Sequence, residues 1–517
     1  MRTLPERFLP LLVVAFLSQL SACAGGGPVL DTAGSPTDSL TKRLQSGAPR
    51  GEESGAAWFS AGMQAARQRG AGLTDARNLI LFVGDGMGPT TVAAARILQG
   101  QRAGASGEEA ELAFERFPSL AMAKTYNTDA QTPDSAGTMT AMIGGAKTRM
   151  GLIGLDQRVK RGRCSGTTQA RLPSLLTLAH GAHMATGLVT TTRITHATPA
   201  AVYATAPERG WEADSLMPAA ARAAGCVDIA EQLRDTVLRG ELQVVLGGGR
   251  QMFIDHSLAP SGKRGDGRDL LAELAQLMPT MHLPITGEQL LGLPPDGPVL
   301  GLFTDDHLDY EHDRRTQNLP QPSLAQMTRV AVQRLQATGQ PYALVVEGGR
   351  IDHAHHKGWA ALALDETIAF AEAVAVADEL TAVDDTLIVV TADHSHTLTF
   401  AGYPARGNPI LGLVRSTNGQ LRRDLQGRPF TTLGYANGPG AATALEDLEQ
   451  ADTEAARFLA PARVALEDES HGGEDVTVYA RGPGSAAVRG VFEQHVLFHL
   501  MALAQPQLRP IVEARAR

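Results

Sequence analysis

The chain has 517 residues, of which 43% are hydrophobic and 20% are charged, and its formal net charge is −9. These values are typical of a globular protein that can bury a sizeable core without a disulfide framework. The negative charge argues against a nucleic-acid-binding protein, which normally presents a basic surface, so we expect no nucleic-acid-specific binding. An anionic substrate must then be attracted by local positive charge.

The first 22 residues have the pattern of a signal peptide. Two arginines precede an apolar run over residues 9–20, which is too short to span a bilayer comfortably and ends in small residues. Cys23 follows, and the ending resembles the lipoprotein box of bacteria, in which such a cysteine is acylated. By that resemblance, Ala24 in place of Asp favours the outer membrane. Cleavage near Ala22 with an incidental cysteine is the alternative. We expect an exported protein, in the periplasm or at the cell surface, anchored through lipid on Cys23.

Composition divides the rest of the chain. Residues 23–57 are rich in Gly, Ser, Pro and Thr without periodicity, which predicts a flexible tether after the cysteine. The globular pattern of a catalytic domain runs from 58 to 503. Within it, residues 401–465 have many Gly, Pro and Asn and predict a loop-rich insertion. Residues 504–517 form a polar tail.

Five apolar runs rich in β-branched residues predict buried strands, and alanine-rich stretches such as 362–380 predict covering helices. The strand runs are 78–83, 187–190, 243–246, 342–346 and 386–391. Continuous apolar strands that alternate with helices indicate an α/β fold, with a large, mostly parallel central sheet flanked by helices on both faces.

Three of these strands end in acidic residues. Asp85 follows the first, Glu347 and Asp352 follow the fourth, and Asp393 follows the fifth. Ligands bind beyond the carboxyl ends of strands in open α/β sheets, and buried carboxylates gathered there repel one another unless cations compensate. Any one of these acids alone would be better explained as a cap of the next helix. Three such strand ends together, with histidines attached, predict a metal site.

Histidine spacing supports that prediction. Asp352 and His356 are four residues apart and share one side of a helical turn, and oxygen plus imidazole ligands suit zinc. His394 directly follows Asp393, so that the two can reach one ion. His471 lies in a polar segment, where a solvated histidine is the alternative. His355 and His396 are expected to lie outside the ligand shell or in solvent.

Ser135 is the candidate nucleophile. Pro133 and Asp134 predict the start of a helix there, whose positive end would favour phosphate oxygens. A metal bound to the serine oxygen lowers its pKa without a histidine base. A serine that merely caps the helix is the alternative.

At these positions the chain resembles the alkaline phosphatase family, specifically its animal-type branch. The match runs in order from about Trp58 to the late 490s. It rests on six segments, GDGMG at 84–88, PDS at 133–135, TRITHATP at 192–199, VEGGRIDH at 346–353, TADHSH at 391–396 and HGGED at 471–475.

The resemblance implies two Zn²⁺ sites and one Mg²⁺ site. Its first zinc set is Asp352, His356 and His471. Its second is Asp85, Asp393 and His394, with Ser135 as a further contact. Its magnesium set is Asp85, Thr198 and Glu347, with His196 and His353 around it.

The resemblance also assigns the phosphate to Arg209, with Arg193 and Arg350 as alternatives. A Ca²⁺ site of the animal-type enzymes is in doubt, because Thr304 stands where a glutamate is expected, although Asp305, Asp306 and Asp309 follow. A homodimer is implied by the resemblance alone.

Three cysteines occur. With Cys23 acylated, Cys164 and Cys226 remain as an even pair in an oxidising compartment, which predicts a disulfide. Two unrelated thiols are the alternative. The positions also match a disulfide of the animal-type branch.

The predicted function is hydrolysis of small phosphate monoesters through a phosphoserine. A phosphodiesterase of the same superfamily and a non-catalytic lipoprotein that binds metal or phosphate are the alternatives. A sulfatase is disfavoured because the sequence after Ser135 lacks the pattern required for formylglycine.

Overall fold

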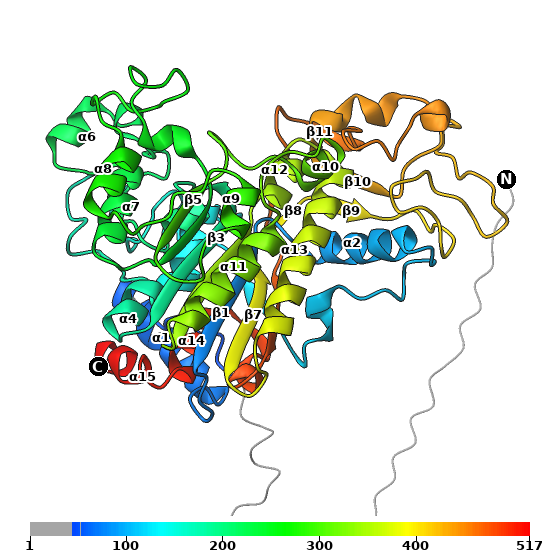
Figure 1. Ribbon diagram of the computed structural model, residues 1–517. Coiled ribbons are helices and arrows are strands. Elements are labelled where there is room, and N and C mark those ends of the chain that lie inside the picture. The colour runs from blue at the N-terminus through cyan, green and yellow to red at the C-terminus, as the bar shows by residue number, and fades with distance from the viewer. Residues whose placement is uncertain (1–43, 52, 517) are drawn as a thin grey trace, which may run out of the picture. The chain divides into compact units, whose positions relative to one another are not determined.

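The computed structural model describes residues 44–51 and 53–516 (Figure 1). The predicted signal peptide, Cys23 and most of the predicted tether lie outside these residues. The strands of the described part are β1 (Asn78–Gly84), β2 (Ser119–Lys124), β3 (Ala185–Arg193), β4 (Val244–Gly248), β5 (Val299–Leu302), β6 (Tyr342–Gly348), β7 (Thr386–Ala392), β8 (Ser395–His396), β9 (Leu398–Phe400), β10 (Leu433–Gly438), β11 (Ala462–Ala465), β12 (His471–Gly472), β13 (Val476–Arg481) and β14 (Gly490–Glu493).

The α-helices of the same part are α1 (Gly55–Gln68), α2 (Pro89–Arg102), α3 (Ser135–Gly144), α4 (Leu175–Gly181), α5 (Ala197–Ala200), α6 (Ala219–Ala223), α7 (Ile229–Leu238), α8 (Leu270–Leu277), α9 (Gly287–Leu291), α10 (Glu311–Thr316), α11 (Leu324–Ala337), α12 (Arg350–His356), α13 (Ala360–Leu380), α14 (Val496–Ala504) and α15 (Arg509–Arg515).

A nine-stranded sheet forms the centre of the fold, in the order β14-β2-β13-β7-β1-β6-β3-β4-β5. The run from β7 to β5 is parallel, and β13 pairs antiparallel with both β7 and β2. Every residue of β1, β6 and β7 is buried, as expected for strands covered on both faces. The predicted α/β fold with a mostly parallel sheet is therefore confirmed.

Helices lie on both faces of this sheet. In Figure 1, α11 and α13 lie in front of the strands, and α1, α4 and α14 lie behind them. Helix α13 is buried along most of its length, because it packs against α2, α11 and α12 as well as against the sheet. Two of its residues, Phe370 and Leu364, are fully buried in the main core.

Both ends of the folded unit differ from the sequence-based boundaries. The compact unit begins at Leu44, not at residue 58. Arg69 explains this, because its guanidinium donates to the backbone oxygens of Gln45 and Val491 and so fastens the early segment to β14. At the other end, the predicted polar tail contains α15, and its residues Leu508 and Val512 are fully buried. Leu508 and Val512 belong to the main hydrophobic core, whereas Ile511 is exposed.

Residues 401–465 contain β10, β11 and three short 3-10 helices, connected by turns. Strand β10 pairs with β9 and β11 in a small sheet separate from the central one. In the described part of the chain, no helix is both long enough and apolar enough to cross a membrane.

Candidate active site

The topology places four strand ends side by side. Strands β7, β1, β6 and β3 are neighbours, and the register pairs Gly84 with both Gly348 and Ala392. Asp85 and Asp393 therefore leave adjacent strands at the same level. Thr190 of β3 pairs with Glu347 of β6, so the fourth strand joins at the same edge.

Ser135 is the first residue of α3. The side chain of Asp134 caps the helix by accepting from Gly137 N at 3.0 Å. The buried Ser135 hydroxyl lies 3.2 Å from His394 Nε2 and 3.4 Å from Asp85 Oδ1. The predicted helix start is confirmed, and the serine points its oxygen at the strand ends, although it is Asp134 that caps the helix.

Two groups of predicted ligands converge beside Ser135. In the first, Asp352 Oδ1 lies 3.4 Å from the Nε2 atoms of both His356 and His471, and the two imidazole nitrogens are 3.2 Å apart. In the second, His394 Nε2 lies 3.3 Å from Asp85 Oδ1 and 3.3 Å from Asp393 Oδ2. Ligand atoms this close can share one ion in each group.

A third group consists mainly of oxygen atoms. Thr198 Oγ1 lies 3.5 Å from Asp85 Oδ2, and Glu347 accepts hydrogen bonds from Thr190 and Thr192 through Oε2. The other oxygen of Glu347 is buried without a hydrogen-bond partner. His196 also approaches Asp85 and Glu347 closely enough to share an ion with them.

The charges of this cluster require compensation. Burial, and then the charges of Asp393, Asp352 and Glu347, raises the pKa of Asp85 well above its usual value. Burial also raises the pKa of Glu347 to about 7 and raises that of Asp393. Burial lowers the pKa of His394, which keeps this imidazole neutral as a ligand must be. Buried carboxylates and neutral imidazoles, together with an unpartnered carboxylate oxygen, fit divalent cations.

Arg209 is held near Ser135 because it bonds to Asp134, the residue that precedes the serine. Its Nη1 donates to Asp134 Oδ2 at 3.2 Å, and its Nη2 lies 3.2 Å from His196 Nε2. The other two candidate arginines have other partners. Arg193 forms a two-bond ion pair with Glu212. Arg350 stacks on the Tyr310 ring with its Cζ 3.9 Å from the centroid, and its Nη1 lies 2.9 Å from His353 Nδ1. The geometry thus favours Arg209.

His353 lies between the third group of residues and the first. Its ring lies 5.4 Å from that of His196, and its Nε2 is 4.0 Å from Asp352 Oδ2. Burial, and then the charge of Arg350, lowers the pKa of His353 to about 3. This imidazole is therefore neutral beside the carboxylates.

Sequence reasoning did not find Glu469, and it placed His396 outside the ligand shell or in solvent. The buried His396 ring bonds to Asp352 Oδ1 at 2.7 Å through Nε2 and to Glu469 through Nδ1. Burial alone would lower the pKa of His396, but Glu469 and Asp352 raise it to about 10. The antiparallel pairing of β8 with β12 places His396 opposite His471. Alternate residues of an extended segment share a face, so the spacing of His394 and His396 could have predicted that both rings face the site.

The three acids near the doubtful calcium site have other partners. Asp305 forms an ion pair with Arg250, Asp306 with Arg193, and Asp309 accepts from Gln321. Among the described residues, none of these three acids belongs to a group that could share an ion.

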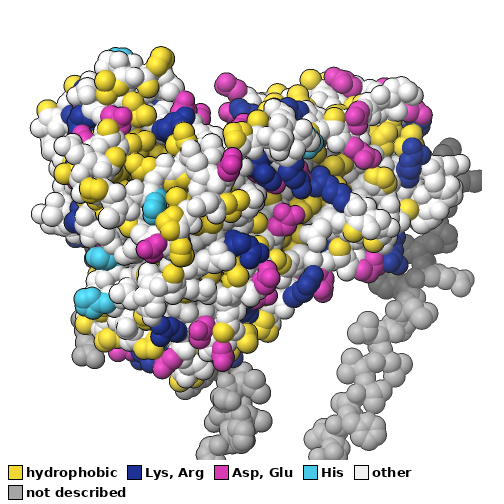
Figure 2. All heavy atoms as spheres, in the orientation of Figure 1, with side chains coloured by type: hydrophobic (Ala, Val, Ile, Leu, Met, Phe, Trp, Pro, Cys, Tyr) yellow, Lys and Arg dark blue, Asp and Glu magenta, His cyan; other side chains and the backbone are white. Residues whose placement is uncertain are grey.

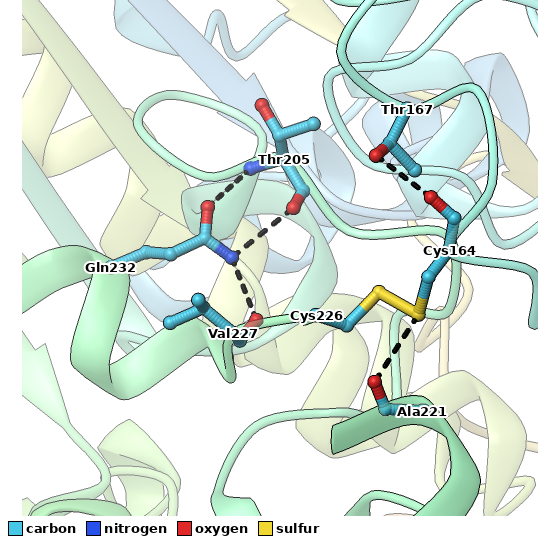
Figure 3. The surroundings of a disulfide bond; sticks show 7 residues. All are labelled: Cys164, Thr167, Thr205, Ala221, Cys226, Val227 and Gln232. Atoms are coloured by element: carbon cyan, nitrogen blue, oxygen red, sulfur yellow. Dashed lines mark hydrogen bonds between the residues drawn. A yellow bond between two sulfur atoms is a disulfide. The ribbon is translucent and has the colours of Figure 1, made fainter. Parts of the chain in front are cut away.

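The predicted disulfide is present. Cys164 and Cys226 are bonded, with Cα atoms 5.8 Å apart (Figure 3). In the same view, Gln232 accepts from Thr205 N and donates to the backbone oxygens of Thr205 and Val227. The disulfide therefore lies beside the contacts that hold Thr205, at the start of the segment that carries Arg209.

Comparisons with known proteins show which family the chain belongs to. The family model described as alkaline phosphatase matches residues 76–506. The tissue-nonspecific alkaline phosphatase of Gallus gallus is 44% identical over 446 residues, covering 83% of this chain and 84% of the relative, and that of Homo sapiens is 41% identical, covering 83% of each. The crystal structure of Thermus thermophilus alkaline phosphatase superposes with a TM-score of 0.62 at 26% identity, covering 86% of this chain and 94% of that one. The chain belongs to the alkaline phosphatase family.

Proposed function

We propose that the protein hydrolyses phosphate monoesters by forming a phosphoserine at Ser135 and then releasing inorganic phosphate. Membership of the alkaline phosphatase family makes the chain an enzyme and sets aside the non-catalytic alternative. The observation that carries the mechanism is the position of the Ser135 oxygen, at the start of α3 and 3.2–3.4 Å from His394 and Asp85. The Ser135 oxygen therefore lies beside Asp85, which belongs to two of the proposed ligand sets, and at the positive end of α3.

The ligand chemistry favours particular cations. The first set has one carboxylate and two imidazoles, from Asp352, His356 and His471. The second set has two carboxylates and one imidazole, from Asp85, Asp393 and His394. Zinc binds such combinations of carboxylate and imidazole ligands. The set of Asp85, Thr198 and Glu347 offers only oxygen atoms, which suits magnesium. When bound, such a pair of zinc ions supplies Lewis-acid stabilisation of the attacking and leaving oxygens and a lowered pKa for bound water.

The chain's own residues position the phosphate. The free N–H groups at the start of α3 and the guanidinium of Arg209 both favour phosphate oxygens, and the planar fork of Arg209 can bind two of them. Asp134 holds this arrangement, because its carboxylate accepts from Gly137 N in α3 and from Arg209.

The reaction then has two displacements at phosphorus. Ser135 Oγ forms a bond to phosphorus as the ester P–O bond breaks, and the leaving oxygen takes a proton to become an alcohol. Water then attacks the phosphoserine, and its oxygen bonds to phosphorus as the bond from phosphorus to Ser135 Oγ breaks. Ser135 Oγ takes up a proton released by the water, and phosphate departs. Because every contact proposed above is to the phosphoryl end and the family acts on monoesters, we assign no particular alcohol to the substrate.

The Ser135→Ala variant tests the nucleophile. We expect no labelled phosphate to be trapped on the variant after acid quench, while its zinc and magnesium content stays near that of the wild type, because the hydroxyl is only one contact beside eight other ligands. The control is the wild-type enzyme with and without a chelator, assayed on a phosphate monoester and a diester. Label on another serine of the variant would refute the assignment, and faster turnover of the diester would favour the phosphodiesterase alternative.

The location of the enzyme belongs to the same proposal. The apolar run before Ala22 supports export, and Cys23 after it supports an acyl anchor in the outer membrane. A homodimer is proposed from the family resemblance. Sedimentation of the purified, metal-loaded protein at several concentrations would test it.

A further inference from the structure

Arg209 lies on a segment, residues 205–210, that is tied to the loop leading out of α3. The tie is made first by the backbone. Its hydrogen bonds run between Ile153 and Ala206 in both directions, from Gly162 N to Pro207 O and from Arg209 N to Gly151 O, at 2.8–3.0 Å. The main chain of Arg209 is therefore fixed to the loop over residues 151–162.

A side-chain pair adds a second tie. Arg161 binds Glu208 through two parallel hydrogen bonds, Nε to Oε2 at 2.6 Å and Nη2 to Oε1 at 2.9 Å. Glu208 Oε1 also accepts from Gly210 N at 3.2 Å. Glu208 and Gly210 flank Arg209 in sequence, so the fork of Arg161 holds the turn on both sides of Arg209.

The ties close into a ring of contacts. The guanidinium of Arg161 lies against Gly151, where an added Cβ would be 2.4 Å from Arg161 Nε. Gly151 N donates to Asp134 Oδ2 at 3.0 Å, and the same oxygen accepts from Arg209. The ring therefore runs from Arg161 through Glu208 and Arg209 to Asp134 and Gly151, and returns to Arg161.

The ring of contacts also neutralises the negative charge of Glu208. Glu208 is next to Arg209, and a free carboxylate there would compete for the guanidinium and repel an incoming phosphate. Partial burial would raise the pKa of Glu208, but the hydrogen bonds and charge of Arg161 lower it. The carboxylate is thus ionised, and Arg161 neutralises it.

We propose that Arg161 and Glu208 are positioning residues for phosphate binding, with Arg161 holding the Glu208 carboxylate away from Arg209. The inference rests on the proposed role of Arg209. Arg161 has side-chain exposure of 49% and Glu208 of 23%, so substitutions at this surface pair can be made without opening the core.

The test compares Arg161→Ala with a matched control in the same loop. Arg158 makes a similar fork with Asp156, through Nε and Nη2 at 2.6–2.9 Å, but contacts no part of the ring. We expect Arg161→Ala to raise the KM for 4-nitrophenyl phosphate and the Ki of inorganic phosphate by about threefold to tenfold, with kcat changed less than about twofold. Arg158→Ala should change neither constant. Equal effects of the two variants would overturn the proposal.

Two further variants separate positioning from general loosening of the loop. Glu208→Gln combined with Arg161→Ala removes the stranded charge and should recover part of the lost affinity, whereas a purely structural role predicts a loss at least as large as that of Arg161→Ala alone. Arg161→Lys keeps the charge and should recover part as well. No recovery in either variant would contradict the role given to the charge of Arg161.

Arg209→Ala distinguishes failure of this inference from failure of the proposed function. If Arg209→Ala leaves the Ki of phosphate unchanged, Arg209 does not bind phosphate and the proposed function is wrong at that residue. If Arg209→Ala weakens phosphate but Arg161→Ala does not, the positioning inference alone fails. In the Arg209→Ala background, Arg161→Ala should raise the Ki by less than about twofold, and a fully additive effect would overturn the coupling.

Discussion

At the scale of single residues, the acidic side chains at the strand ends give the site a high density of negative charge. Asp85, Glu347 and Asp393 are buried, and burial keeps the neighbouring imidazole of His394 neutral. Asp352 is also buried but is paired with His396, whose pKa is raised to about 10. Like charges at this density oppose folding unless cations are bound. The same residues that make the reaction possible therefore destabilise the metal-free protein.

This conflict gives a prediction for Asp85→Asn. In the presence of a chelator, the variant should unfold at a higher temperature than the metal-free wild type, because one of several buried like charges is gone. With zinc and magnesium saturating, the order should reverse, because Asp85 contributes to two ligand groups. Calorimetric unfolding of both proteins under both conditions measures this. A variant less stable than the wild type in both states would contradict the charge argument.

His396 gives a second prediction at this scale. Its ring lies between Asp352 and Glu469 and orients the carboxylate of the set proposed to hold the first zinc. Residues in such a position typically contribute tenfold to a hundredfold in metal affinity, so His396→Gln should weaken the tightest zinc by about that factor. Competition with a chromophoric chelator measures the affinity.

A neighbouring histidine supplies the control. His355 is also buried and stacks on His396, but it bonds to Thr91 and Tyr435 and to no carboxylate of the site. His355→Gln should therefore leave zinc affinity within about threefold of the wild type. If the two variants lose zinc equally, the effect belongs to packing and not to the orientation of Asp352.

At the scale of elements, the disulfide joins the two segments that support Arg209. Cys164 follows the loop that contacts residues 205–210, and Cys226 precedes α7, whose Gln232 holds Thr205 (Figure 3). The two supports of the Arg209 segment are thus covalently connected to each other.

Removing this bond should lower stability. It closes a loop of 62 residues, for which chain entropy predicts a loss of about 4 kcal/mol in the free energy of unfolding of the Cys164→Ser, Cys226→Ser double variant. Denaturant unfolding with metals saturating measures the difference. Reductant should destabilise the wild type and leave the double variant unchanged. If reductant affects both proteins equally, its action does not come from this bond.

Much of the element arrangement follows from local sequence patterns. The apolar runs that end in Asp85, Glu347 and Asp393 predict both the strands and their shared edge, and the spacing of Asp352 and His356 predicts one face of α12. These signals are local, or follow from the rule that parallel strands end together.

The contacts that escaped prediction are non-local. Glu469 reaches His396 only because β8 pairs with β12, and Arg161 reaches Glu208 across 47 residues. The early segment near Gln45 is held through a backbone oxygen that accepts from Arg69. A bond of this kind leaves no periodic pattern in the side chains, so the sequence does not reveal it. The pairing of partners distant in sequence is decided by the tertiary fold.

At the scale of the whole molecule, the chain is acidic, with a net charge of −9. On the face in Figure 2, acidic and basic side chains are interspersed, with one gathering of Lys and Arg side chains. Ion pairs of Arg102 and Arg315 with Asp365 neutralise exposed arginines. With a net charge of −9, the chain as a whole is not drawn to an anionic membrane surface.

Membrane attachment, if it occurs, must then come from lipid, and Cys23→Ser tests this. Several acyl chains on one cysteine would hold the protein firmly, since each buried methylene contributes about 0.8 kcal/mol and a single chain binds only marginally. We expect the wild type in the outer-membrane fraction and the variant in the soluble periplasmic fraction. The kinetic constants should be equal, because the compact unit begins at Leu44 and holds every proposed ligand. The control is Ser21→Thr, which alters the same segment and keeps the cysteine. A soluble wild type whose mature N-terminus lies elsewhere would instead support ordinary cleavage and secretion.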